Sequence, residues 1–155
     1  MRICTATTDD IPALARIRAA EWCTEDYWQT RIAGYLGGTL HPQKALAPRV
    51  IYVAEDGDIA VGLIAGHLTH RYDCDGELEW IDVIKEHRSR GVAAELLQTL
   101  ARWFVEHDAK RICVDVAPEN IVARKFYRRY GAVDLNPHWL VWPDIQTALQ
   151  PLMKD

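Results

Sequence analysis

The spacing of hydrophobic and polar residues changes along the chain, and each change of period predicts an element. Two-residue alternation and short apolar runs predict strands, and these fall at residues 2–6, 50–54, 59–70, 78–84, 111–116 and 139–142. A 3.6-residue period predicts helices, and these fall at about 11–20, 25–35, 91–107, 120–130 and after Pro143. Hairpin turns at 56–58 and 72–76 and a loop at 42–48 complete the first half.

Capping signals support the ends of these helices. Residues 8–10, Thr-Asp-Asp, supply an N-cap and an acidic first turn. Gly37 and Gly38 end the second helix, and Gly131 follows the helix that residues 118–120 cap. Apolar stripes align in the first, the longest and the final helix, respectively: Ile11, Leu14, Ile17 and Ala20; Val92, Leu96, Leu97, Leu100, Trp103 and Phe104; Ile145, Leu149 and Leu152.

The predicted order of elements is β-α-α-β-β-β-α-β-α-β. This order indicates an α/β fold with one mixed sheet and helices on both of its faces. The 155 residues are enough for one well-buried core and too few for two ordinary domains, so residues 1–155 are expected to form a single domain.

Composition narrows the classes of function. Hydrophobic residues make up 49% of the chain and charged residues 26%, which argues against disorder or a fibre. The formal net charge of −4 argues against nucleic acid or an anionic membrane as a partner and favours a cationic substrate. The N-terminus lacks the apolar segment of a signal peptide, and no apolar run is long enough to span a bilayer.

Cysteine and histidine positions predict neither disulfides nor a metal site. The chain has four scattered cysteines without a C-x-x-C pair, which fits a reduced cytoplasmic protein: Cys4, Cys23, Cys74 and Cys113. His67 and His70 lie near Cys74, but residues three apart on a strand point to opposite faces. The two histidines are therefore expected to be core or solvated residues, with a catalytic role for one as the alternative.

A tight turn after the strand at 78–84 opens the longest helix. It reads Arg88-x-x-Gly91-x-Ala93. Gly91 lets the backbone approach a ligand closely, and the first N–H groups of the helix, at the positive end of its dipole, form a site for a phosphate or pyrophosphate. Arg88 or Arg90 can add a charge-assisted hydrogen bond. The alternative is an ordinary strand-to-helix turn with solvated arginines.

A second motif begins at Asn120 and ends at Gly131, and it includes Ala123, Phe126 and Tyr127. Helical spacing puts Asn120, Ala123 and Tyr127 along one side of the helix. Alone, this pattern also fits a capped amphipathic helix with half-buried tyrosines.

The two motifs, separated by an amphipathic helix and a strand, resemble those of the GNAT superfamily of N-acetyltransferases. The resemblance spans roughly residues 51–132. It implies a GNAT-like twisted mixed sheet, acetyl-CoA as the acyl donor, no metal, and direct transfer of the acetyl group to a primary amine without a covalent enzyme intermediate.

The resemblance also assigns residues. Val83, with Ile84 beside it, falls where the strand backbone of the family bonds the acetyl carbonyl and the pantetheine arm. Asn120 falls where a side chain contacts the cofactor arm, and Tyr127 falls on the tyrosine that lies near the thioester sulfur and serves as general acid. The backbone that would cradle coenzyme A belongs to Arg88, Ser89, Arg90, Gly91, Val92, Ala93 and Ala94.

The chemistry calls for the same parts. A backbone N–H can stabilise the oxyanion that forms when an amine attacks a thioester, and the departing thiolate benefits from a proton donor such as the Tyr127 hydroxyl. A lysine-like amine has a pKa of about 10.4, so a group must remove its proton. Glu79 is the first choice for this general base, and Glu77 and Asp82 are the alternatives.

Strand alternation assigns these carboxylates to faces of the sheet. It places Glu77 and Glu79 together with Ile81 and Val83 on one face. The other face then carries Leu78, Trp80 and Asp82. A bulge, which the family often has in this strand, would break this parity.

Residues 21–28 join the first two helices, and in the family this region commonly lines the acceptor site. Its aromatic and acidic side chains suit a cationic amine, so the partner is expected to be an amine on a small molecule or on a protein. The alternative is that Trp22 and Trp28 simply pack the core.

The chain departs from the family pattern at three places. Lys85 stands where proline is frequent, and Ala132 replaces a common aromatic residue. The Trp-rich tail from Leu135 is predicted to end in a helix where a β-hairpin partner strand is typical, so it is expected to form a homodimer surface or a lid. The alternative function is a noncatalytic acyl-CoA-binding or regulatory module of the same fold.

Overall fold

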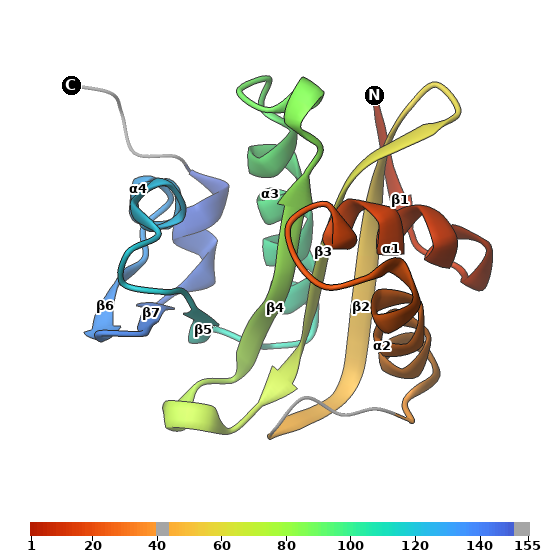
Figure 1. The fold of residues 1–155 in the computed structure, drawn as a ribbon. Helices are drawn as coiled ribbons and strands as arrows, with labels where there is room; N and C mark the ends of the chain where they lie inside the picture. Colours follow the sequence, from red (N-terminus) through yellow and green to blue (C-terminus); the bar gives the residue numbers. More distant parts are fainter. Residues whose placement is uncertain (40–43, 151–155) are drawn as a thin grey trace.

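Seven strands form one mixed sheet in the computed structural model, which describes residues 1–39 and 44–150 (Figure 1). The spatial order of the strands is β1-β2-β3-β4-β5-β7-β6. Their bounds are β1 Arg2–Thr5, β2 Ala45–Asp56, β3 Ile59–Thr69, β4 Gly76–Val83, β5 Ile112–Asp115, β6 Val133–Asn136 and β7 Trp139–Trp142. The predicted α/β fold with one mixed sheet is confirmed.

Among the described strands, only β4 and β5 pair in parallel, and they pair over a short length. Three residue pairs join them, from Gly76 opposite Ile112 to Leu78 opposite Val114. β4 nevertheless continues to Val83. The two strands therefore part after Leu78, and no strand in the described part of the chain pairs with the far half of β4 on that side.

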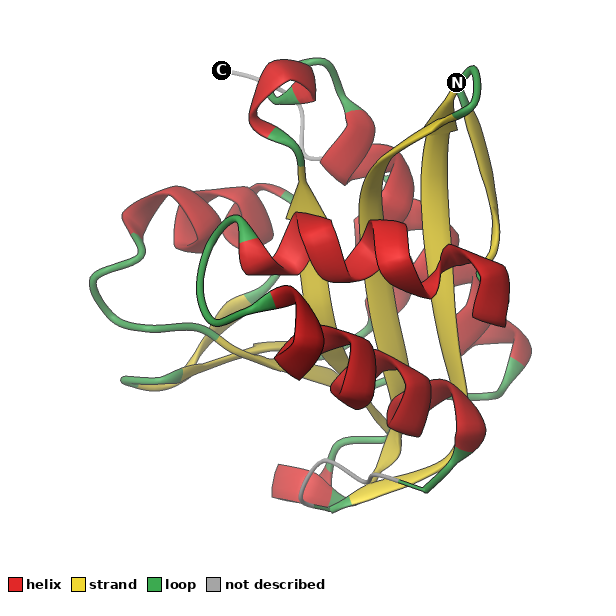
Figure 2. Ribbon diagram, turned by 45° about the vertical axis from the view of Figure 1, so that its right-hand side comes forward, coloured by secondary structure: helices red, strands yellow, loops and turns green. Residues whose placement is uncertain are grey.

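Helices cover both faces of the sheet. In Figure 2, α1 (Ile11–Ala19) and α2 (Glu25–Gly37) cross the front of the strands, and α3 (Val92–Glu106) lies behind them. α4 (Ile121–Arg129) shares the hydrophobic core of α3. Four 3₁₀ segments complete the fold: η1 Thr8–Asp10, η2 Arg71–Asp73, η3 Lys85–His87 and η4 Ile145–Leu149.

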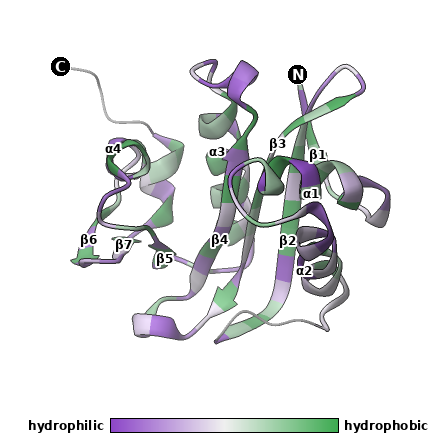
Figure 3. Cartoon of the chain, viewed as in Figure 1, coloured by the Kyte–Doolittle hydropathy of each residue, from purple (hydrophilic) through white to green (hydrophobic). Residues whose placement is uncertain are grey.

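Hydrophobic cores of the described residues lie on both faces of the sheet. On the α1–α2 side, Leu14, Trp28 and Ile32 pack against β2 and β3. On the other side, the predicted stripe of α3 is buried throughout. Each fully buried leucine of this stripe contributes about 1.5–3 kcal/mol to folding. Figure 3 shows that β4, between these cores, also carries hydrophilic positions.

Two predictions for the strands were wrong. Residues 45–48, predicted as loop, begin β2, because Pro48 lies at a register shift between Leu46 and Arg49 where the strand tolerates its missing N–H. β6 was missed because its apolar–polar alternation spans only four residues, and its pairing with β7 is itself irregular. The hairpin partner strand expected of the family is therefore present.

The final helix is shorter than predicted. Residues Ile145–Leu149 form the 3₁₀ segment η4, in which Ile145 is buried. Leu152, and Pro42 of the predicted loop, lie outside the described residues. No helix in the described part of the chain combines the length and hydrophobicity needed to cross a bilayer.

Candidate active site

A β-bulge occurs where β4 leaves β5. Ala65 of β3 pairs with Trp80 and the next residue, Gly66, pairs with Leu78, so Glu79 is the extra residue. Leu78 consequently belongs to the core under α3, whereas Trp80 belongs to the core under α1 and α2. The prediction that these two side chains share a face was wrong, because it assumed unbroken alternation.

The turn before α3 exposes unpaired amides, as predicted. Gly91 has a φ of +83° and Ser89 has a φ of +63°, and these left-handed residues turn the chain into the helix. The Glu95 N–H donates to the Gly91 carbonyl. No described residue accepts a hydrogen bond from the amides of Val92, Ala93 or Ala94. These amides, at the positive end of a 15-residue helix, can bind a phosphate.

Arg88 contacts β4 and the segment that follows α1. Its Nε donates to the Val83 carbonyl at 2.9 Å, and its guanidinium pairs with Glu21. The Asp82 carboxylate lies 3.9 Å from the same guanidinium. The neighbouring Ile84 N–H donates to Val61 within the sheet at 2.8 Å, so this amide is already paired.

A groove of about 600 Å³ lies beside these residues. It separates the end of α1 from the ends of β3 and β4. Its lining includes Ile17, Glu21, Asp82, Val83 and Arg88. The predicted cofactor residues on β4 therefore border an open groove.

The three candidate bases on β4 have different partners. Glu77 accepts a hydrogen bond from Arg71 Nε at 3.1 Å. Asp82 Oδ2 lies 3.6 Å from Arg18 Nη1. Among the described residues, only His67 comes within ion-pair distance of Glu79, with Nδ1 4.0 Å from Oε1. Glu79 is thus the carboxylate without an arginine partner.

Burial shifts the titration of two of these groups. Burial, and then the charge of Glu77, raise the pKa of Glu79, while the nearby His67 opposes the shift. Burial raises the pKa of Asp82 to about 6, although Arg18 opposes it. Raised pKa values bring both carboxyl groups closer to the range in which a general base works at neutral pH.

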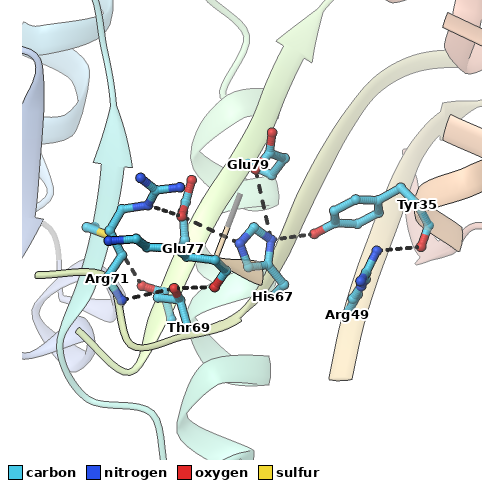
Figure 4. A network of polar contacts seen from close by, with 10 residues as sticks. Tyr35, Arg49, His67, Thr69, Arg71, Glu77 and Glu79 are labelled. Carbon is cyan, nitrogen blue, oxygen red and sulfur yellow. Dashed lines mark hydrogen bonds and ion pairs between the residues drawn. The ribbon is translucent and has the colours of Figure 1, made fainter. Parts of the chain in front are cut away.

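A histidine and a tyrosine join the carboxylates in a buried network (Figure 4). The Tyr35 hydroxyl lies 2.9 Å from His67 Nδ1. His67 Nε2 lies 3.5 Å from Glu77 Oε1. The sequence analysis expected His67 to be a core or solvated residue and did not single out Tyr35. A lone histidine in an apolar strand carries no signal of its partners. His70, by contrast, is exposed, so the expectation that the two histidines do not converge is confirmed.

Tyr127 projects from α4 into the core near the parted strands. Only 4% of the residue is exposed, and its ring packs edge-on against Trp142 at 5.6 Å. No described residue hydrogen-bonds its hydroxyl. Burial raises the pKa of this phenol, and the charge of Arg18 opposes the shift. The hydroxyl therefore keeps its proton at neutral pH.

Arg18 is a site residue that the sequence analysis missed. Its guanidinium lies over the Trp28 ring at 4.3 Å from the centroid and within 5.8 Å of the Trp80 ring. Burial lowers the pKa of Arg18, and the charge of Asp82 opposes this shift. An arginine on an amphipathic helix gives no sequence signal that it turns inward.

Two other expectations concern Asn120 and the segment between the first helices. The Asn120 side chain caps α4 by accepting from the Ala123 N–H at 3.2 Å. Trp28 is buried, which confirms for this residue the alternative that it packs in the core. Trp22 is 56% exposed and stacks near the half-exposed Tyr27, so two aromatic rings face solvent beside the start of α2.

Comparison with known proteins points to one family. The model of the Acetyltransferase (GNAT) family matches residues 11–132. The aminoglycoside N(6')-acetyltransferase type 1 of Salmonella typhimurium is 29% identical over 86 residues, which cover 52% of this chain. The match spans 59% of that relative's length.

Solved structures share the fold. The apo aminoglycoside 6'-N-acetyltransferase of Acinetobacter haemolyticus has a TM-score of 0.73 at 20% identity and covers 88% of this chain and 93% of its own. The PaiA N-acetyltransferase of Thermoplasma acidophilum, solved in complex with coenzyme A, has a TM-score of 0.67 at 14% identity and covers 91% of this chain and 98% of its own.

Proposed function

The chain belongs to the GNAT family of acetyltransferases, which use acetyl-CoA, and we propose that it transfers the acetyl group directly to a primary amine. The main support is the parting of β4 and β5 next to the unpaired amides of α3. That arrangement offers a phosphate site, an open strand edge and a proton acceptor within one region. Glu79 and Tyr127 supply the groups that move protons.

Binding of the donor falls to the backbone. The amides of Val92, Ala93 and Ala94 would hold the pyrophosphate, since they lie at a helix N-terminus and have no partner among the described residues. The Val83 backbone would orient the pantetheine arm, with Arg88 giving up its contact to the Val83 carbonyl. Acetyl-CoA supplies the activated acyl group.

Glu79 is the proposed general base. Glu77 and Asp82 each have an arginine within ion-pair distance, whereas Glu79 has none among the described residues, so its carboxylate is free to accept a proton. Its raised pKa moves it toward neutrality. Glu79 would take a proton from the acceptor's ammonium group, which frees the nitrogen lone pair to attack the thioester.

Tyr127 is the proposed proton donor to the departing sulfur. Its hydroxyl is protonated at neutral pH and has no competing acceptor among the described residues. The phenol can give its proton to the departing thiolate and be reprotonated from solvent.

The acceptor is proposed to be a cationic amine on a small molecule or a protein. Exposed Trp22 and Tyr27 can contact a cation through their ring faces. Aminoglycosides, which the Salmonella relative's name gives as its substrate, are one member of this class.

A thiol-release assay with acetyl-CoA and a panel of amines tests this function. We expect turnover with one class of amines and a 10²–10⁴-fold lower kcat in Glu79→Gln, the usual value of a general base. The matched control is Glu106→Gln, an exposed glutamate near the end of α3. Saturable acetyl-CoA binding by calorimetry without turnover on any amine would instead support the noncatalytic module.

A further inference from the structure

A fully buried histidine lies between the two glutamates of β4, and the mechanism above does not use it. His67 is 0% exposed. Its Nε2 faces Glu77 at 3.5 Å and its Nδ1 faces Glu79 at 4.0 Å (Figure 4). The imidazole is therefore placed to act on both carboxylates.

Tyr35 fixes the orientation of this ring. Its hydroxyl lies 2.9 Å from Nδ1, and the phenol comes from the buried face of α2. When both ring nitrogens carry a proton, the Nδ1–H donates to the Tyr35 hydroxyl oxygen and the Nε2–H points at Glu77, so the ring is a cation between the two carboxylates. Nε2 has no hydrogen bond within the described structure, since 3.5 Å is too long for a good one.

A carboxylate oxygen of Glu77 and one of Glu79 lie within 4.8 Å of each other. Two buried carboxylates at this distance disfavour each other's ionised form. Glu77 has Arg71 Nε at 3.1 Å, whereas no arginine among the described residues lies within ion-pair distance of Glu79. The charged and titratable groups that face Glu79 come from five elements: Glu77, His67, Arg71, Arg18, and Arg31 with Tyr35. Of these, His67 is the one that contacts both carboxylates.

We propose that His67 is a positioning residue which, held in place by Tyr35, keeps Glu79 ionised beside Glu77 so that Glu79 can act as the base. The role of His67 rests on the proposed function, because it assumes that Glu79 is the general base of the acetyl transfer. His67 does not touch the substrate in this account. It acts through the carboxylate that does.

A divalent cation is the competing occupant of this cluster. One ligand atom from each of His67, Glu77 and Glu79 lies within 4.8 Å of the others. However, Arg71 Nε already donates to the same Glu77 oxygen that faces His67, at 3.1 Å. A cation would have to share that oxygen with a guanidinium, which argues for the imidazole acting alone.

Carboxyl NMR of protein labelled with ¹³C-glutamate tests the proposal without requiring activity. Glu79→Gln identifies the Glu79 signal, which is then titrated in the wild type and in His67→Gln. We expect the midpoint of Glu79 to move to higher pH by about one unit in His67→Gln, because the amide cannot carry a charge. Tyr35→Phe, which keeps the ring in the core, should give a smaller shift in the same direction.

His107→Gln is the matched control, since the His107 imidazole bonds to Trp103 within α3. It should leave the Glu79 midpoint unchanged. An unshifted Glu79 midpoint in folded His67→Gln overturns the proposal, and if that variant does not fold, an unshifted midpoint in Tyr35→Phe does so.

The pH profile of kcat provides the second measurement. The acidic limb should move upward in His67→Gln by the same amount as the NMR midpoint, with the plateau rate retained. Loss of wild-type activity in EDTA and its return with Zn²⁺ or Mn²⁺ would replace the proposal with a metal site. If the wild type transfers no acetyl group, the proposed function fails, and the NMR titration still decides the role of His67.

Discussion

The three candidate bases on β4 have the same carboxylate group but different partners. Glu77 contacts Arg71, Asp82 contacts Arg18, and Glu79 contacts only a histidine among the described residues. The residue types were readable from the sequence, and Glu79 was the first choice there. The partners were not readable, because Arg18, Tyr35 and His67 come from distant segments.

Tyr127→Phe tests the proton donor. Removing the hydroxyl should lower kcat about 10²-fold or more, because the thiolate then leaves without a proton. The affinity for acetyl-CoA should change little, since the ring still packs on Trp142. Steady-state kinetics with calorimetry measures both quantities.

Tyr52→Phe is the control for this variant. Tyr52 is a partly buried tyrosine on β2 that packs against the same core. An unchanged kcat in Tyr127→Phe would remove the phenol from the mechanism.

The raised pKa of Asp82 predicts that the free energy of unfolding depends on pH. Its pKa is about 6 in the folded chain and 3.8 when free, so the folded state binds the extra proton between these values. The free energy of unfolding should therefore lose a contribution as pH rises from 4 to 7, worth about 2–3 kcal/mol. Asp82→Asn should lack this loss.

Urea unfolding of the wild type and of Asp82→Asn at pH 4.5 and pH 7.5 measures this pH dependence. The difference in unfolding free energy between variant and wild type should shift in favour of the variant at the higher pH. A difference that is equal at both pH values would show that Asp82 titrates normally.

At the scale of elements, local patterns predicted most of the fold, and irregular pairing limited the rest. The stripe of α3 and the turn at Gly91 follow directly from spacing and residue type. The bulge at Glu79 does not follow from local patterns, because it depends on how β3 pairs with β4. β6 was missed for the same reason, since its pairing with β7 makes it a strand.

The approach of α3 to the sheet makes its own prediction. A Cβ on Gly66 would lie 2.9 Å from Leu100 Cδ1 and 3.1 Å from the Glu77 carbonyl oxygen. Gly66→Ala should therefore destabilise the protein by about 1–3 kcal/mol, the usual cost of overpacking. Chemical unfolding measures this loss.

Gly37→Ala is the matched control. Gly37 is the last residue of α2, and a Cβ there would meet nothing within 4 Å. It should be neutral or slightly stabilising. Equal stabilities for the two variants would contradict the close packing of β3 under α3.

For the whole molecule, the parting of β4 and β5 brings distant segments to one place. The turn at Gly91 and the helix carrying Tyr127 could be matched to a family from sequence. How α1 and α2 bring Arg18 and Tyr35 to β4 could not, because nothing in either helix's own pattern marks an inward polar residue. The fold therefore creates the site's electrostatics, while the sequence motifs indicate only its chemistry.

Direct transfer of the acetyl group is the central claim, and a single-turnover experiment with radiolabelled acetyl-CoA tests it most directly. Without amine, the label should stay on coenzyme A. With the amine found in the panel assay, the label should appear as amide at the rate at which thiol is released, and at no time on the protein. Label on the protein before it reaches the amine, or thiol release without amide, would contradict the account.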